Sequence, residues 1–180
     1  ILRFTNSEAP LILFSQKPNV GTELMVYYKS NTPMVFGNIA RTMAIKQLNV
    51  FSAQVFITHN FHALCTIMFQ NKKGMPLDHD RLNNLRKAII AGLDDHSQTL
   101  DISASTRQIF EIPTKISFLE NMSKKQTNLE ISTLDRQGLL AKIGITLGSL
   151  DCLIRAARIT TTGERADDFF AITDVNGLPL

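Results

Sequence analysis

Cysteine, an excess of charge of one sign and long apolar runs are all scarce in this 180-residue chain. Two cysteines without a C-x-x-C pair favour buried free thiols over a disulfide framework or a finger-type zinc site. A net charge of +3 is too small to predict nucleic-acid or membrane binding. No apolar run approaches the roughly 18–20 residues of a membrane span, and no signal peptide opens the chain. The composition, 44% hydrophobic, predicts a cytosolic globular protein with a real core.

A repeated phrase indicates how the chain is organised. GMPL begins at Gly74, and GLPL begins at Gly177, 103 residues later. Apolar residues with helical or strand spacing recur at that interval or one residue more. The matching positions are Phe36, Ile39 and Met43 with Leu140, Ile143 and Leu147, Ala53 with Ala157, and Ile67 and Phe69 with Phe170 and Ile172. The sequence therefore predicts two copies of one unit.

The first copy predicts the order strand, helix, strand, strand, helix, strand. Strands are expected at residues 22–28, 49–58 and 63–69, and helices at about 33–46 and after Asp78, a plausible N-cap. The second helix places Leu82, Leu85, Ile89 and Leu93 on one side. The fourth strand is expected within residues 107–119, after a polar loop. This order predicts an α+β, ferredoxin-like βαββαβ fold with helices on one face of an antiparallel sheet.

The second copy begins near Asn128 and is truncated after its third strand. It repeats a strand in NLEISTLD, a helix in GLLAKIGITLGSL and strands in LIRAARITTT and DDFFAITD, then stops at the repeated turn. Half a unit buries too few apolar side chains to stand alone. We expect it to lean on the first copy or on a neighbouring molecule, or to have been cut short, since the chain begins at Ile1 rather than Met. The predicted divisions are a linker at 1–20, a unit at 21–120, a linker at 121–127 and an incomplete unit at 128–180.

The turn before the first helix of the second copy, LDRQGLLAKIG at residues 134–144, resembles that of the ACT domain, a small-molecule sensing module. LEISTLDRQGLLAKIG, ARITTTGERADDFFAITD, GTELMVYYKSNTPMVF and AQVFIT resemble, more narrowly, the C-terminal tandem ACT region of bifunctional PII uridylyltransferase/uridylyl-removing enzymes. The resemblance covers nearly the whole chain. It implies a glutamine-responsive regulatory region in nitrogen signalling, with PII as partner. It also implies upstream nucleotidyltransferase and HD domains that use Mg²⁺, and no cofactor in this segment.

A free amino acid requires partners for its carboxylate, its ammonium group and, in glutamine, a neutral amide. Unpaired N–H groups at a helix start suit the carboxylate. Asp135 either balances the ammonium group or caps its helix, and its counterpart Asn31 is neutral. Asn49 either reads the amide or serves as a turn residue. We expect one site completed across the two units. The predicted binding residues are Asp135, Gly138, Leu139, Leu140, Asn31, Met34, Val35, Phe36 and Asn49.

No catalytic or metal-binding residues are predicted in this chain. Asp167 and Asp168 are adjacent, so on a strand they point to opposite faces and cannot hold one metal ion as a D-x-D pair does. His79 and Asp80 open a helix, and HNFHALC suits a hairpin turn better than a zinc site.

Other functional classes remain open at this point. One is an ACT regulatory tail of a different metabolic or stringent-response enzyme. Another is an RNA-binding domain with the same strand order, although ALCTIMF lacks the aromatic RNP1 pattern. Open sheet edges also make a homo-oligomer an expectation.

Overall fold

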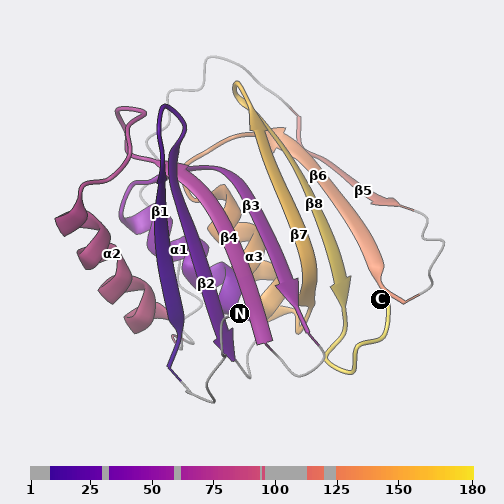
Figure 1. Ribbon diagram of the computed structural model, residues 1–180. Helices are drawn as coiled ribbons and strands as arrows, with labels where there is room; N and C mark the ends of the chain where they lie inside the picture. Colours follow the sequence, from indigo (N-terminus) through magenta and orange to yellow (C-terminus); the bar gives the residue numbers. More distant parts are fainter. Residues whose placement is uncertain (1–8, 30–32, 59–61, 94, 96–112, 120–124) are drawn as a thin grey trace.

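The structure is a computed structural model that describes residues 9–29, 33–58, 62–93, 95, 113–119 and 125–180. This part of the chain forms one antiparallel eight-stranded sheet with three helices behind it (Figure 1). The α+β class is therefore confirmed. The elements are β1 (Leu11–Lys17), β2 (Gly21–Lys29), α1 (Val35–Ile45), β3 (Asn49–Ile57), β4 (His62–Gln70), α2 (His79–Gly92), β5 (Lys115–Leu119), β6 (Thr127–Leu134), α3 (Leu139–Ser149), β7 (Leu153–Thr162) and β8 (Arg165–Thr173).

The strand order shows that the two copies lie side by side in one sheet. The order is β1-β2-β4-β3-β7-β8-β6-β5, so each half repeats the other in reverse. The halves join where β3 pairs with β7, and there Gln54 faces Arg158. These two residues are 104 positions apart, the interval of the repeat. An approximate two-fold axis therefore passes between them, and the second copy leans on the first through a continuous sheet.

The predicted fourth strand is wrong in its position. β5, the described end of residues 107–119, pairs with β6 of the second copy. The place beside β2 is taken by β1, which precedes it in the chain. A three-residue turn with Asn19 at φ 60° joins β1 to β2, and closing so short a connection costs less entropy than returning a strand from beyond α2. Residues 107–112 lie outside the described residues, and the unit boundaries stay predictions.

The repeated turn is the same in both copies down to its hydrogen bonds. The N–H of Asn71 donates to the carbonyl of Met75 at 2.9 Å, and 103 residues later that of Asp174 donates to Leu178 at 2.8 Å. In each copy the side chain of the first residue accepts two backbone N–H bonds. Gly74 and Gly177 both have positive φ, 72° and 81°, which explains why the phrase keeps its glycine. The repeat seen in the sequence is confirmed.

Helices α1 and α3 cross at unusually close range because glycines meet there. A Cβ added to Gly144 would lie 2.7 Å from the Cα of Gly37, and one added to Gly37 would lie 2.7 Å from the backbone nitrogen of Ile145. Ala40 and Ala141, the positions related to these glycines by the repeat, are also buried. The crossing fixes the C-terminal half of α1 beside the start of α3, which positions the site described below.

The core lies between the sheet and the helices. Phe36 of α1 contacts Phe170 of β8 edge to face, with ring centroids 6.5 Å apart. On α2, the predicted cap is confirmed, since the carboxylate of Asp78 accepts a 2.8 Å bond from the N–H of Arg81. The four apolar residues predicted on one side of that helix are all buried. Cys65 and Cys152 are buried free thiols, as predicted.

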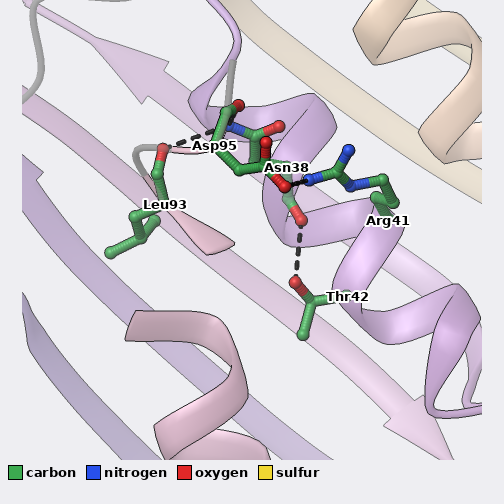
Figure 2. A network of polar contacts seen from close by, with 5 residues as sticks. All are labelled: Asn38, Arg41, Thr42, Leu93 and Asp95. Atoms are coloured by element: carbon green, nitrogen blue, oxygen red, sulfur yellow. Dashed lines mark hydrogen bonds and ion pairs between the residues drawn. The ribbon is translucent and has the colours of Figure 1, made fainter. Parts of the chain in front are cut away.

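A polar network ties the end of α2 to α1 (Figure 2). Asn38, itself 1% exposed, donates from Nδ2 to the carbonyls of Leu93 at 3.1 Å and Asp95 at 2.9 Å. Arg41 forms an ion pair with Asp95, and the hydroxyl of Thr42 donates to the carbonyl of Asn38 at 3.0 Å. Asn38 of α1 thereby supplies a hydrogen-bond donor to carbonyl groups at and after the C-terminal end of α2, where the last carbonyls of a helix lack intrahelical donors.

Replacing Asn38 by alanine is expected to lower the free energy of unfolding by about 2 kcal/mol, because the buried carbonyl of Leu93 loses its partner. Urea denaturation measures the change. Asn83→Ala is the matched control, since its amide contacts His79 at an exposed site on α2 and its loss should cost less than about 0.5 kcal/mol. Equal effects of the two substitutions would contradict the role given to the network.

Candidate functional site

A cavity of about 190 Å³ lies where the two copies meet. The first copy contributes the C-terminal half of α1 and the first residues of β3, including Asn49. The second copy contributes the turn before α3 and its first residues, including Asp135 and Gly138. We call this the interface cavity. It lies next to the glycine crossing, on the side where the C-terminal half of α1 and the start of α3 line it.

Asp135 stands at the wall of this cavity and does not cap the helix. α3 begins at Leu139 with Gly138 as its N-cap, at φ 83°, so the capping alternative for Asp135 is wrong. The backbone N–H of Asp135 donates to the carbonyl of Glu164 at 2.8 Å, which holds the residue in place. Burial raises the pKa of its carboxyl above the ordinary value, while a hydrogen bond from the N–H of Arg136 acts in the opposite direction. The carboxylate therefore lies in a partly dehydrated position, where an opposite charge binds more strongly.

The predicted helix-start donors are only partly in place. Gly138 and Leu140 line the interface cavity, whereas Leu139 does not. The N–H of Leu139 donates to the carbonyl of Arg136 at 2.9 Å, so that donor is already occupied. No side chain caps α3 within the described residues, which leaves its start without a side-chain acceptor. Gly138 at positive φ is the N-cap, so α3 begins at Leu139 and not directly after Asp135.

The corresponding end of α1 does not form such a site in the described residues. Met34, Val35 and Phe36 are buried and do not line the interface cavity. Met34 occupies the position that Gly138 holds in the second copy, and its Cγ lies 2.9 Å from where a Cβ on Gly148 would be. Asn31 lies outside the described residues. The structure thus gathers Asp135, Gly138, Leu140 and Asn49 around the interface cavity, while Leu139, Met34, Val35 and Phe36 do not line it.

The interface cavity is also lined by residues that were not among the predicted binding residues. The side chain of Gln137 reaches across the junction, and its Nε2 donates to the carbonyl of Ala44 at 3.1 Å. Gln47, at φ 55°, and Lys72, from the repeated turn, come from the first copy. Lys72 corresponds to Val175 of the second copy, 103 residues later. This difference between the copies was a usable signal, but the cavity that gives it meaning depends on the pairing of the copies.

Asp168 is a second carboxyl group that the sequence reading did not assign to the ligand-binding side. It is 2% exposed, on the helix-facing side of β8, and its Oδ1 has no partner among the described residues. Burial raises its pKa to about 7, and the charges of Asp135 and Asp167 contribute in the same direction. Asp167 lies on the other face and bonds to Arg165 at 2.9 Å, so the prediction of opposite faces is confirmed.

Relatives of known name match nearly the whole chain, including both copies and the interface cavity between them. The chain is 34% identical over 184 residues to the bifunctional uridylyltransferase/uridylyl-removing enzyme of Vibrio cholerae serotype O1, covering 100% of this chain and 21% of that protein. Proteins of the same name from Vibrio campbellii and Photobacterium profundum are 33% identical over 98% and 96% of the chain. Its relatives are bifunctional uridylyltransferase/uridylyl-removing enzymes. The chain spans 20–21% of the length of these enzymes.

Two further comparisons add little to the likeness with uridylyltransferase/uridylyl-removing enzymes. No protein-family model matches the chain. Among solved structures, aspartate kinase from Synechocystis aligns with a TM-score of 0.48 and 12% identity, over 86% of this chain and 24% of that chain. A likeness at that level carries no functional argument. Among the helices in the described ranges, none has the length and apolar character to cross a bilayer.

Proposed function

We propose that the interface cavity binds a free amino acid and that glutamine is its ligand. One observation carries the proposal: Asp135 and Asn49, from different copies, line the same cavity. A cavity of about 190 Å³ is smaller than the roughly 300–1,000 Å³ of drug-sized pockets, which suits a ligand the size of a single amino acid. The lining offers a carboxylate, a cation and amides, which are the partners that a zwitterion with an amide side chain needs.

Each group of the ligand has a partner of matching chemistry. The carboxylate of Asp135 would receive the ammonium group. Lys72 and the start of α3 at Gly138 would receive the ligand's carboxylate, the first by its charge and the second by its dipole. Asn49 can donate to and accept from an amide at once, which distinguishes glutamine from glutamate. Gln137 donates a hydrogen bond to the carbonyl of Ala44 and so connects the two copies at the edge of this cavity.

For the whole protein we propose that this chain is the regulatory region of an enzyme of the kind that its relatives' name describes. A ligand held by Asp135 on one copy and Asn49 on the other stabilises the arrangement in which the copies are closed together. Catalytic domains outside this chain, a Mg²⁺-dependent nucleotidyltransferase and an HD hydrolase acting on PII, would read that arrangement. The relatives' name favours this over an ACT tail of another enzyme or an RNA-binding module.

Substituting Asp135 by asparagine is expected to weaken glutamine binding at least about tenfold, because the ammonium group loses a charge-assisted hydrogen bond worth about 1.5–3 kcal/mol. Isothermal titration at neutral pH measures the change. Lowering the pH should weaken binding to the unaltered protein as Asp135 becomes protonated, and its raised pKa places that loss above the range of an ordinary aspartate. The asparagine variant should not show this pH dependence.

Glu130→Gln is the matched control, since it removes an exposed carboxylate from β6, the strand that leads to Asp135. Its glutamine affinity should equal that of the unaltered protein. An Asp135→Asn variant that binds glutamine with unchanged affinity would remove this carboxylate from the site.

A further inference from the structure

A second and larger cavity, of about 470 Å³, lies beside the interface cavity under the start of α2. The end of α1, the turn after β4 and the first turns of α2 form its walls. Four cationic side chains line it, and we call it the lysine cavity: Lys46, Lys72, Lys73 and Arg81. The interface cavity is a different space, with which it shares Lys72, Gln47 and Leu48.

The charge in the lysine cavity is unbalanced. Its lining holds four cations and no carboxylate, in a chain whose net charge is only +3. One acidic residue reaches Arg81 from outside the lining, since Oδ2 of Asp78 lies 3.5 Å from its Nε, and both side chains are exposed. Asp78 therefore offsets part of the charge of Arg81, whereas Lys46, Lys72 and Lys73 form no ion pair with a described residue. Cations gathered in one concave site repel each other, so an anion placed among them is attracted by all of them.

The lining also has an apolar part. Leu48, Leu77 and Leu85 are 9%, 5% and 2% exposed and line the lysine cavity beside the cations. Two amide side chains, Asn71 and Asn84, complete the wall. A site with a leucine surface and a cationic rim fits a ligand that is anionic at one end and flat or apolar at the other.

We propose that the lysine cavity binds a nucleotide, with its phosphates on the lysines and arginine and its base against the leucines. Lysine binds phosphate as a point charge and arginine as a planar donor, so a mixed set suits a chain of phosphates with several oxygens. An inorganic polyphosphate would use the cations alone. A nucleotide uses both parts of the wall, which is why the leucines favour it.

Lys72 links this site to the amino-acid site. It lines both cavities, so phosphate bound to it withdraws a cation from the ligand carboxylate in the interface cavity. Each ligand should therefore weaken the binding of the other by the same factor, because coupling between two sites is reciprocal. This coupling rests on the proposed function, whereas nucleotide binding itself does not.

Isothermal titration of ATP and of tripolyphosphate into the 180-residue chain, at low salt and without Mg²⁺, tests the proposal. Both should bind, with ATP the tighter because only ATP can contact the leucines. The double variant Lys46→Glu, Lys73→Glu should weaken both at least about tenfold, since each lost charged contact is worth about 1.5–3 kcal/mol. The control double variant Lys87→Glu, Lys115→Glu changes the same net charge at exposed positions outside both cavities and should change affinity less than about threefold.

Three outcomes would overturn the proposal: no ATP binding at millimolar concentration, equal weakening by both double variants, or equal affinity for ATP and tripolyphosphate. Circular dichroism and melting temperature establish that each variant is folded. Titrating glutamine into the same proteins separates this proposal from the previous one, because Lys46 and Lys73 do not line the interface cavity. Glutamine binding should survive the double variant, and a chain that binds ATP but never glutamine would count against the amino-acid site alone.

Discussion

Replacing Gly144 by valine should destabilise the protein by at least about 3 kcal/mol and abolish glutamine binding. A Cβ at this position would lie 2.7 Å from the Cα and 3.0 Å from the nitrogen of Gly37. Both atoms are backbone and cannot rotate away, so the helices must separate. Overpacking in a close-packed core costs about 1–3 kcal/mol, occasionally more, and a backbone obstacle places this case at the upper end. Urea denaturation and titration of glutamine measure the two effects.

The sign of this effect distinguishes packing from helix propensity. Valine is a better helix former than glycine by a few tenths of a kcal/mol, so a position without a steric obstacle would gain stability. Thr146→Val, on an exposed position of the same helix, introduces the same side chain without a crossing and should stay within about 0.5 kcal/mol. A Gly144→Val protein as stable as that control would show that the two copies are not held by the helix crossing.

Local pattern was enough to predict most elements of both copies, but not β1, which lies in the range predicted as a linker. The turn at Gly74 and Gly177 forms all of these hydrogen bonds within five residues, and its glycine adopts the positive φ that the turn needs. A short stretch of sequence is therefore enough to predict it. The helix faces follow for the same reason: Leu82, Leu85 and Ile89 need only their own spacing to lie on one side. Strand β7 was predicted at its observed bounds because ten residues between two turns allow little else.

The local sequence pattern could not predict which distant strands pair with each other. An edge strand such as β1 or β5 forms hydrogen bonds on one side only, and its sequence does not say which neighbour it joins. The placement of β5 against β6 depends on the pairing of the whole sheet, which a local pattern does not contain. The error in the fourth strand is therefore an error of topology, while the segment that was named does contain a strand.

The candidate site was predicted where one helix start defines it and missed where the copies meet. Asp135 and Gly138 follow from the turn before α3, and Asn49 from its place at the head of β3. Lys72 and Gln47 become neighbours of Asp135 only through the β3–β7 junction and the helix crossing, which involve residues about 100 positions apart. Asp168 is placed within the second copy, where β8 pairs with β6 and β7. Asp168 in particular looked like half of an adjacent acidic pair, because burial cannot be read from a dipeptide.

Exchanging Asp168 for asparagine should raise the free energy of unfolding by up to about 4 kcal/mol at pH 8, the largest gain expected from a single substitution here. The pKa of this carboxyl is about 7 in the folded protein, against 3.8 ordinarily. Each pKa unit corresponds to about 1.4 kcal/mol, so about three units give the figure above. Asparagine keeps an acceptor for the N–H of Thr160 and cannot ionise, which removes the cost of a buried charge.

The pH dependence fixes the cause of this gain. Between pH 3.8 and about 7 the folded protein binds a proton that the unfolded chain has lost, so the stability linked to Asp168 is present at low pH and lost as the pH rises through 7. Urea denaturation of both proteins should therefore show nearly equal stability near pH 4 and a difference that grows up to about pH 8. Asp167→Asn has the opposite expectation, because hydrogen bonds from Ser132 and Arg165 lower the pKa of Asp167 and its charge is stabilising at neutral pH. If Asp168→Asn instead destabilised the protein at pH 8, a partner for the buried carboxylate would have to exist, and its position beside Asp135 would make the bound amino acid the first candidate.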